Sequence, residues 1–204
     1  MKKILSVAVL GSTGYVGLEL VKILIRHPNI QIKFLGCENS PSKDIREFDQ
    51  NIVIDTLPKL DLNNNFDPKN YDLVFLSLPH GVSHKFVKNF NRKIKIIDLS
   101  ADFRLDSEKL YSKNYNNDHA CPELLNQFIY GLPEINKDVL NTNFDVAVPG
   151  CYPTSVLIPL IPLLEKNLIK TDNIIIDSKS GYSGAGKKFD LNNIKNKLEF
   201  NFYN

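Results

Sequence analysis

Apolar and polar residues alternate in blocks along the first 150 residues, and these blocks predict strands and helices in alternation. Residues 4–10 form a continuous apolar run, which is typical of a parallel strand buried on both faces. After a glycine-containing turn, apolar residues recur at helical spacing and stop near Pro28: Leu18, Leu20, Val21, Leu24 and Ile25. Residues 31–36 predict a second strand, so the chain begins with a strand–helix–strand unit of a parallel sheet.

Further blocks continue the pattern. We expect strands at residues 72–78, 94–99 and 144–148, a short strand at 52–54 and a helix at 82–90. Residues 105–127 are polar and irregular, and residues 130–134 predict a turn. Residues 155–164 predict a buried helix, but Pro159 and Pro162 mean that it kinks there or is partly irregular. Residues 173–177 predict a last strand before a Gly- and Ser-rich loop with three lysines.

The overall composition excludes several classes of protein. The chain has 204 residues, of which 43% are hydrophobic, and its net charge of +2 comes with scattered basic residues rather than a nucleic-acid footprint. The apolar start resembles a signal peptide, but it is short and Glu19 and Lys22 soon follow. No apolar run is long enough to span a membrane, so we expect a cytoplasmic protein.

The cysteines point to a reducing compartment. Cys37, Cys121 and Cys151 are odd in number and far apart, which argues against a disulfide framework. His119 and Cys121 are too few to hold zinc, and no other Cys/His set has ligand spacing, so no metal site is expected.

A glycine-rich turn follows the first predicted strand directly. It consists of Gly11, Ser12, Thr13, Gly14, Tyr15, Val16 and Gly17. Strand, glycine turn and helix in this order predict a Rossmann-type nucleotide site, in which the backbone approaches a pyrophosphate at the helix N-terminus. The spacing is G-x-x-G-x-x-G rather than G-x-G-x-x-G, so a simple tight turn is the alternative.

The residues after the second predicted strand leave the choice of nucleotide open. Glu38 stands about twenty residues past the glycines, where an acid binds a ribose 2′-hydroxyl and favours NAD. Ser40, Ser42 and Lys43 could instead hold the 2′-phosphate of NADP. All four could also be ordinary polar loop residues.

Two other loops carry candidate residues. Pro79 and His80 follow the strand at 72–78, and because ligands of open parallel sheets collect beyond the carboxyl ends of the strands, His80 is expected near a cofactor. An exposed histidine without a role is the alternative. Asp102 and Arg104 follow the strand at 94–99 and could simply pair with each other.

Cys151 is the candidate nucleophile. It follows the strand at 144–148 and a Pro-Gly turn, and Pro153 lies near the first turn of the next helix. The positive end of that helix favours a thiolate, which suits acyl chemistry. A buried structural cysteine is the alternative. The pattern of alternating strands and helices changes near Pro149, which predicts an α/β Rossmann-type domain at 1–149 and a different domain from 150.

Six motifs together resemble the N-acetyl-gamma-glutamyl-phosphate reductase family, the NADPH-dependent enzymes of arginine biosynthesis. They are residues 11–17 (GSTGYVG), 78–83 (LPHGVS), 98–104 (DLSADFR), 130–134 (YGLPE), 149–154 (PGCYPT) and 179–186 (KSGYSGAG). The resemblance covers nearly the whole chain, and six motifs in this order are highly specific.

The resemblance implies an activity and site roles. N-acetylglutamyl 5-phosphate would acylate Cys151, phosphate would leave, and NADPH would reduce the thioester to the semialdehyde. The family's preference favours NADP, with Ser40 and Ser42 at the 2′-phosphate. By the same resemblance, residues 11–17, Pro79, His80, Ser183 and Gly184 would contact the cofactor, and Arg104 and Lys179 the substrate. The full-length family members are expected to be homo-oligomers.

One departure from the family is serious. Family members are much longer, and their catalytic histidine lies in a stretch that this chain lacks, so none of His27, His80, His84 or His119 takes that role. The chain therefore resembles an N-terminal portion of a family member, and the resemblance implies that residues 150–204 are the incomplete start of an α+β substrate and catalytic domain. The alternatives are a sister acyl-phosphate reductase, of the aminoadipate pathway or acting on aspartate semialdehyde, and a nucleotide-binding module without catalysis.

Overall fold

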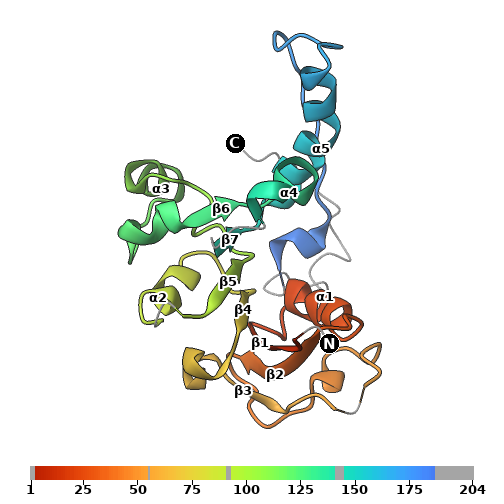
Figure 1. Cartoon of the computed structure of the whole chain (residues 1–204), viewed down its shortest axis with the longest axis vertical. Coiled ribbons are helices and arrows are strands. Elements are labelled where there is room, and N and C mark those ends of the chain that lie inside the picture. Colours follow the sequence, from red (N-terminus) through yellow and green to blue (C-terminus); the bar gives the residue numbers. More distant parts are fainter. Residues whose placement is uncertain (1–2, 55, 91–92, 141–144, 187–204) are drawn as a thin grey trace, which may run out of the picture.

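The computed structural model describes residues 3–54, 56–90, 93–140 and 145–186, and within these ranges the chain builds a seven-stranded sheet (Figure 1). All pairings between its strands are parallel. The strands are β1 (Leu5–Leu10), β2 (Ile30–Cys37), β3 (Leu60–Leu62), β4 (Leu73–Leu76), β5 (Lys95–Asp98), β6 (Phe128–Tyr130) and β7 (Asp145–Ala147). The parallel, Rossmann-type sheet that the sequence predicts for the first domain is confirmed.

The strand order is β3-β2-β1-β4-β5-β7-β6. The chain therefore starts in the middle of the sheet, builds outward through β2 and β3, and then crosses to β4 on the other side of β1. In register, Val7 of β1 lies opposite Ile32 of β2 and Leu73 of β4. This reversal of direction between β1 and β4 is the topological switch point at which doubly wound sheets bind their ligands.

Helices connect the strands. They are α1 (Tyr15–Leu24), α2 (Ser83–Val87), α3 (Glu108–Tyr115), α4 (Pro133–Leu140) and α5 (Cys151–Glu165). Short 3₁₀ turns add η1 (Ile45–Glu47), η2 (Asn63–Asn65), η3 (Pro68–Asn70), η4 (Pro122–Gln127) and η5 (Tyr182–Ala185).

The core fills both faces of the sheet, which explains why β1 is apolar throughout. Val7 and Val9 pack in one buried cluster with Leu18, Val21 and Leu24 of α1. Ala8 and Leu10, whose side chains point to the opposite face, pack in a second cluster with Val87 and Phe90. A continuous apolar run is the pattern that such a doubly covered strand requires.

Three predictions about secondary structure are wrong. Residues 52–54 form no strand, and the outer strand β3 comes later, at Leu60–Leu62, where it pairs with Leu35–Cys37 of β2. Residues 105–127 are not irregular throughout, because α3 begins after the N-cap Ser107 and ends at Tyr115, where the C-cap Asn116 adopts the left-handed conformation (φ 49°). Residues 130–134 are not only a turn, since Tyr130 ends β6 and Pro133 begins α4.

The segment after β7 also differs from the sequence prediction. Helix α5 begins at Cys151 itself and continues through Pro159 and Pro162, but none of its residues is buried. It projects away from the sheet in Figure 1. Residues 173–177 form no strand, and Ile175 is 93% exposed. Among the described residues, no strand lies beside this segment to complete a sheet. The predicted loop at 178–188 is described to Gly186, and its last two residues and the tail lie outside the described residues.

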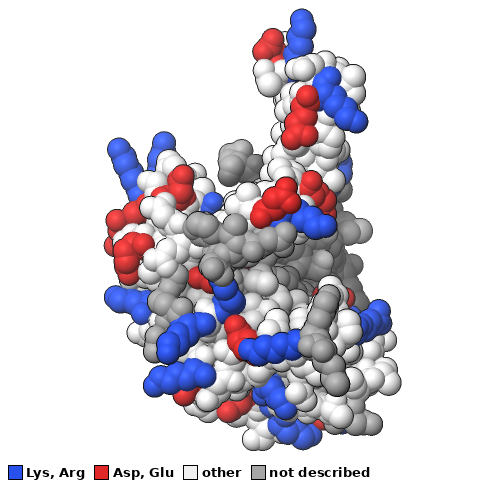
Figure 2. Space-filling view, in the orientation of Figure 1, with Lys and Arg blue, Asp and Glu red and all other residues white. Residues whose placement is uncertain are grey.

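On the face seen in Figure 2, Lys and Arg are interspersed with Asp and Glu, so that this face carries charges of both signs. In the described part of the chain, no helix is both long and apolar enough to cross a membrane. No group of three or more His, Cys, Asp or Glu side chains in the described ranges could hold a metal ion.

Candidate active site

The candidate residues collect at one edge of the sheet because all the strands are parallel. The loops after β1, β2, β4, β5 and β7 leave the sheet at this carboxyl edge, and they carry the glycine turn, Ser40 and Ser42, His80, Arg104 and Cys151 respectively. The topology therefore brings together segments that are up to 140 residues apart in the sequence.

The glycine turn is held tightly between β4 and the start of α1. Gly11 has a φ of +73°, and a Cβ atom on it would lie 2.8 Å from the carbonyl carbon of Ser77 and overlap its oxygen. A Cβ atom on Gly17 would lie 2.8 Å from the Cα of Ser12 and overlap the carbonyl oxygen of Gly11. Gly14, the N-cap of α1, has ordinary space around it, with the nearest atom 3.5 Å away. Two glycines are therefore required by packing, whereas Gly14 leaves the helix N-terminus open to a ligand.

Ser12 has a structural contact. Its side chain is fully buried, and both its backbone N–H (2.8 Å) and its hydroxyl (2.9 Å) donate to the carbonyl oxygen of Gly36 in β2. Tyr15 and Val16 are exposed on the first turn of α1.

Asn63 is a site residue that the sequence analysis missed. Its side-chain oxygen accepts a hydrogen bond from the Gly11 N–H (3.0 Å) and lies where a Cβ atom of Gly36 would be. Asn63 thus holds the glycine turn from the carboxyl end of β3. Because the sequence analysis placed this strand at 52–54, eight residues before β3, the Asn-rich stretch at 63–65 could not be connected with the turn.

The loop after β2 is clamped to β3. The Ser42 N–H donates to the Leu60 carbonyl oxygen (2.7 Å), and the Leu60 N–H donates to the Lys43 carbonyl oxygen (2.9 Å). Ser42 adopts a left-handed conformation with φ 68°, which turns the loop back. The side chains of Glu38 and Ser42 are exposed and that of Ser40 is partly exposed, so all three can meet a ligand. Lys43 lies 3.7 Å from Glu47.

His80 and Asp102 form a pair that the sequence analysis did not foresee. Asp102 is fully buried, and its Oδ1 lies 2.8 Å from Nδ1 of His80. The Gly81 N–H also donates to this oxygen (2.8 Å), and the His84 N–H donates to Oδ2 (3.1 Å). Asp102 and Arg104 therefore do not form the ion pair that the sequence left as an alternative, because Arg104 contacts other groups.

Arg104 ties the end of β5 to the loop before Cys151. Its Nε donates to the carbonyl oxygen of Val148 (2.7 Å) and its Nη2 to that of Leu99 (3.1 Å), while Nη1 lies beside Gly150. Val148 N–H in turn donates to the Asp98 carbonyl oxygen (2.8 Å). These contacts fix the turn from which α5 starts.

Cys151 is exposed and is the first residue of α5, whereas Cys37 and Cys121 are buried. The prediction that this thiol lies at a helix N-terminus is confirmed, and the alternative of a buried structural cysteine is wrong. All three cysteines are free thiols.

Burial changes the charge states of the groups near these loops. It raises the pKa of Asp98 to about 6, although hydrogen bonds from the Ser100 hydroxyl (2.7 Å) and N–H (3.1 Å) act in the opposite direction. Burial also lowers the pKa of His84 and of His119 and raises that of Tyr111, which donates to Asp102 (3.2 Å). His84 and His119 are therefore neutral at physiological pH.

The Gly- and Ser-rich segment returns to the start of α5. The hydroxyl oxygens of Ser155 and Ser178 are 3.4 Å apart, in agreement with Figure 1, where the chain turns back after α5 and runs along it. Lys179 forms an exposed ion pair with Asp177 (2.6 Å). Ser183 and Gly184 lie on the 3₁₀ turn η5, and the Gly184 N–H donates to the Gly181 carbonyl oxygen (3.0 Å). These contacts are local and leave the predicted roles of Lys179, Ser183 and Gly184 as predictions.

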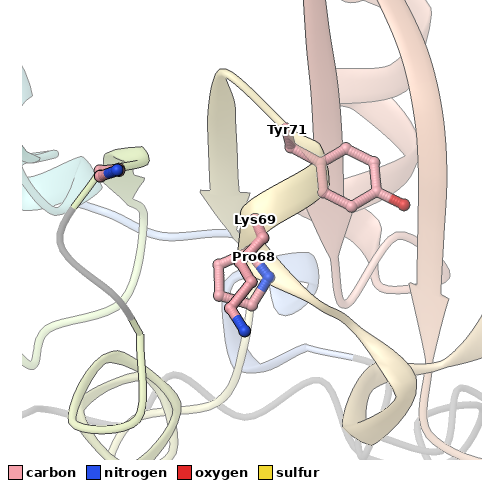
Figure 3. Close-up of a pocket in the computed structure, with 4 residues that line it drawn as sticks. Pro68, Lys69 and Tyr71 are labelled. Carbon is pink, nitrogen blue, oxygen red and sulfur yellow. The ribbon is translucent and has the colours of Figure 1, made fainter.

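A surface hollow of about 250 Å³ lies away from the candidate site residues (Figure 3). Pro68, Lys69, Tyr71 and Lys93 line it, and they precede β4 and β5 in the chain. It therefore belongs to the amino edge of the sheet, opposite the edge that carries Cys151.

Two solved structures have the same fold. Aspartate semialdehyde dehydrogenase II from Vibrio cholerae superposes with a TM-score of 0.60 at 19% identity, covering 81% of this chain and 43% of that one. Aspartate semialdehyde dehydrogenase with NADP from Candida albicans gives a TM-score of 0.56 at 20% identity, covering 80% and 48%.

Closer relatives share the sequence. N-acetyl-gamma-glutamyl-phosphate reductase from Ehrlichia canis (strain Jake) is 45% identical over 193 residues, which cover 93% of this chain and 55% of the relative. The protein of that name from Acinetobacter baylyi is 42% identical over 202 residues, covering 97% and 58%. The chain thus spans about half the length of the curated relatives that it matches.

Two family models match the chain. The model described as "Semialdehyde dehydrogenase, dimerisation domain" matches residues 151–204. The model described as "Semialdehyde dehydrogenase, NAD binding domain" matches residues 6–143, which is more than half of the sequence. On this match, the chain belongs to the semialdehyde dehydrogenase family.

Proposed function

We propose that this chain carries the nucleotide site and the nucleophile for NADPH-dependent reduction of N-acetylglutamyl 5-phosphate to N-acetylglutamate 5-semialdehyde and phosphate, a step of arginine biosynthesis. The observation that carries the proposal is the exposed Cys151, presented at the start of α5 on the same sheet edge as the glycine turn. The names of relatives at 41–46% identity support the choice of substrate.

Cys151 performs the acyl transfer. Its thiolate attacks the acyl carbon, the bond from that carbon to the phosphate oxygen breaks, and phosphate leaves with the electron pair, so that a thioester remains. Cys151 is the first residue of α5, and Arg104 holds the preceding turn in place. After reduction, the same sulfur leaves as thiolate while the semialdehyde forms.

The glycine turn fits a dinucleotide. Gly14 leaves the backbone at the N-terminus of α1 open, and residues 11–17 would hold the pyrophosphate there. Pro79, His80, Ser183 and Gly184 would contact other parts of the cofactor. When bound, NADPH supplies the hydride that reduces the thioester.

We assign NADP rather than NAD as the cofactor. Ser40 and Ser42 stand at the carboxyl end of β2 with accessible side chains, where hydroxyls can donate to a 2′-phosphate. Arg104 and Lys179 are proposed to contact the substrate.

The proposal also covers the domains and the association of subunits. Residues 1–149 are the NADP-binding domain and residues 150–204 begin a catalytic domain, through which full-length subunits associate. The match of residues 151–204 to a dimerisation domain supports this association. The free thiols support a reducing, cytoplasmic location.

Acyl transfer to Cys151 tests the proposal. The chain is mixed with N-acetylglutamyl phosphate, made in place from N-acetylglutamate and ATP by a kinase, and its intact mass is followed. We expect one hydroxylamine-labile acyl group on the wild type and none on Cys151→Ala. Aspartyl phosphate and acetyl phosphate serve as matched donors. Equal labelling by all three, or labelling of Cys151→Ala, would refute the proposed substrate or the proposed nucleophile respectively.

A further inference from the structure

Asp102 is a buried carboxylate surrounded by hydrogen-bond donors. Its Oδ1 contacts Nδ1 of His80 (2.8 Å), the N–H of Gly81 (2.8 Å) and the hydroxyl of Tyr111 (3.2 Å). Its Oδ2 accepts from the N–H of His84 (3.1 Å). Asp102 thereby joins the loop after β4, the loop after β5 and helix α3.

This arrangement determines which nitrogen of His80 carries the proton. A carboxylate can only accept hydrogen bonds, so the Nδ1 atom that faces Asp102 must be the protonated one. In the neutral ring, Nε2 is then an acceptor. The imidazole also packs against the ring of Tyr115 at an interplanar angle of 43°, with ring centroids 4.3 Å apart, and its side chain is 36% exposed. The ring is therefore held at Nδ1, while part of the side chain stays exposed.

All four histidines of the chain are among the described residues. In the other three, Nδ1 accepts a hydrogen bond and therefore carries no proton in the neutral ring. Nδ1 accepts a backbone N–H in each of the three: from Asn29 in His27 (3.2 Å), from Ala120 in His84 (2.6 Å) and from Cys121 in His119 (3.3 Å). In His119, Nε2 also donates to the Asp102 carbonyl oxygen (3.0 Å). His80 alone faces a carboxylate with Nδ1.

His80 belongs to the loop that contacts the predicted nucleotide site. It follows β4 by four residues, and Ser77 of the same loop packs directly on Gly11. A lone pair at Nε2 would repel a phosphate oxygen, but it can accept from the hydroxyl and amide groups of a dinucleotide. The chemistry at this position therefore suits the uncharged part of the cofactor.

We propose that Asp102 is a positioning residue that holds His80 in the Nδ1-protonated form, so that Nε2 accepts a hydrogen bond from a ribose hydroxyl or the carboxamide N–H of the bound dinucleotide. The second half of this inference rests on the proposed function, because it assumes that NADPH binds at this edge.

The ring protonation can be read directly by NMR. Long-range ¹H–¹⁵N spectra of the ¹⁵N-labelled chain, without cofactor at neutral pH, distinguish the two neutral forms of each histidine. We expect three rings protonated at Nε2 and one at Nδ1, and the latter signal should be absent from His80→Asn. A His80 ring protonated at Nε2, or at both nitrogens, would overturn the role of Asp102. In Asp102→Asn, the share of the Nδ1-protonated form should fall; an unchanged share in a folded variant would also overturn it.

Two substitutions of His80 test the acceptor. Asn at this position keeps an N–H beside Asp102 but has no atom at the place of Nε2, whereas Gln puts an amide oxygen near that place. We expect His80→Asn to weaken NADPH and NADH binding by about tenfold, and His80→Gln by less than about threefold. Equal weakening by both variants would overturn the acceptor role. The NMR pattern needs no cofactor, so a wild type that binds no NADPH would refute the proposed function and the acceptor role while the Asp102–His80 result stands by itself.

Discussion

The three glycines of the turn after β1 have different physical reasons to be glycine, and alanine substitutions should separate them. In Gly11→Ala, a residue with a side chain would have to adopt φ +73° and overlap the carbonyl group of Ser77. The left-handed conformation costs about 1 kcal/mol, and the displacement of β4 costs about 1 to 3 kcal/mol more. We therefore expect Gly11→Ala to lower the free energy of unfolding by about 2 to 4 kcal/mol.

Gly14→Ala is the matched control within the same turn. Gly14 has φ −71° and ψ 165°, which any residue adopts, and its added Cβ would have an ordinary contact of 3.5 Å with Gly11. Loss of a glycine N-cap should cost less than about 1 kcal/mol. The same Cβ would, however, stand where the backbone would meet a pyrophosphate, so NADPH should bind about tenfold or more weakly.

Urea unfolding followed by circular dichroism gives the stability, and calorimetric titration with NADPH gives the affinity. The two variants should differ in opposite ways: Gly11→Ala should be destabilised, whereas Gly14→Ala should remain stable and bind NADPH poorly. If Gly11→Ala unfolded at the same urea concentration as Gly14→Ala, the packing argument would be wrong. Full NADPH affinity in Gly14→Ala would contradict the placement of the pyrophosphate.

Three further predictions concern other parts of the carboxyl edge. Changing Ser40 and Ser42 to Asp should weaken NADPH binding far more than NADH binding in parallel titrations, because carboxylates repel the 2′-phosphate; equal losses would place that phosphate elsewhere. Asp98 has a pKa of about 6, above its unfolded value, so its contribution to stability is present below about pH 4 and is lost as the pH rises through about 6. As the pH rises from about 4 to about 6, the free energy of unfolding of Asp98→Asn, measured with urea, should therefore increase by up to about 3 kcal/mol relative to that of the wild type. A difference between the two proteins that does not change with pH would contradict this. Arg104→Lys should slow acylation of Cys151 by about tenfold or more without changing NADPH affinity, since lysine cannot bond both Leu99 and Val148 carbonyl oxygens; unchanged acylation would show that the clamp is dispensable.

The sequence predicted the elements that have strong local signals. β1 and α1 were predicted because β1 is buried on both faces and α1 has one apolar face, and both patterns are visible in one sequence. Cys151 could be placed at a helix N-terminus because Pro153 and the preceding Pro-Gly turn are local signals.

The errors arise where tertiary contacts decide the structure. β3 has three residues and exists because it pairs with the end of β2, while the more apolar residues 52–54 lack a partner strand. Residues 173–177 have a strand-like pattern, but in the described part of the chain no strand lies beside them. The N-cap Ser107 was a local signal for α3 that the polar composition of the segment concealed.

The site contacts were the hardest to predict. Asn63 reaches Gly11 across 52 residues of sequence, and Asp102 reaches Gly81 across 21. Neither spacing is periodic, and both contacts depend on the strand order. Arg104 was expected at the substrate, and its observed contacts with two backbone carbonyls are compatible with that role but could not be foreseen from the motif.

Discharge of the acylated enzyme tests most directly whether nucleophile and nucleotide meet at this edge of the sheet. The chain is first acylated with N-acetylglutamyl phosphate, freed of excess donor and mixed with NADPH, and nicotinamide absorbance and intact mass are followed together. We expect each acylated Cys151 to consume one NADPH and to release the semialdehyde faster than the thioester hydrolyses by itself. A thioester that persists while NADPH is bound would contradict the account, because Cys151 and the cofactor would then occupy separate places.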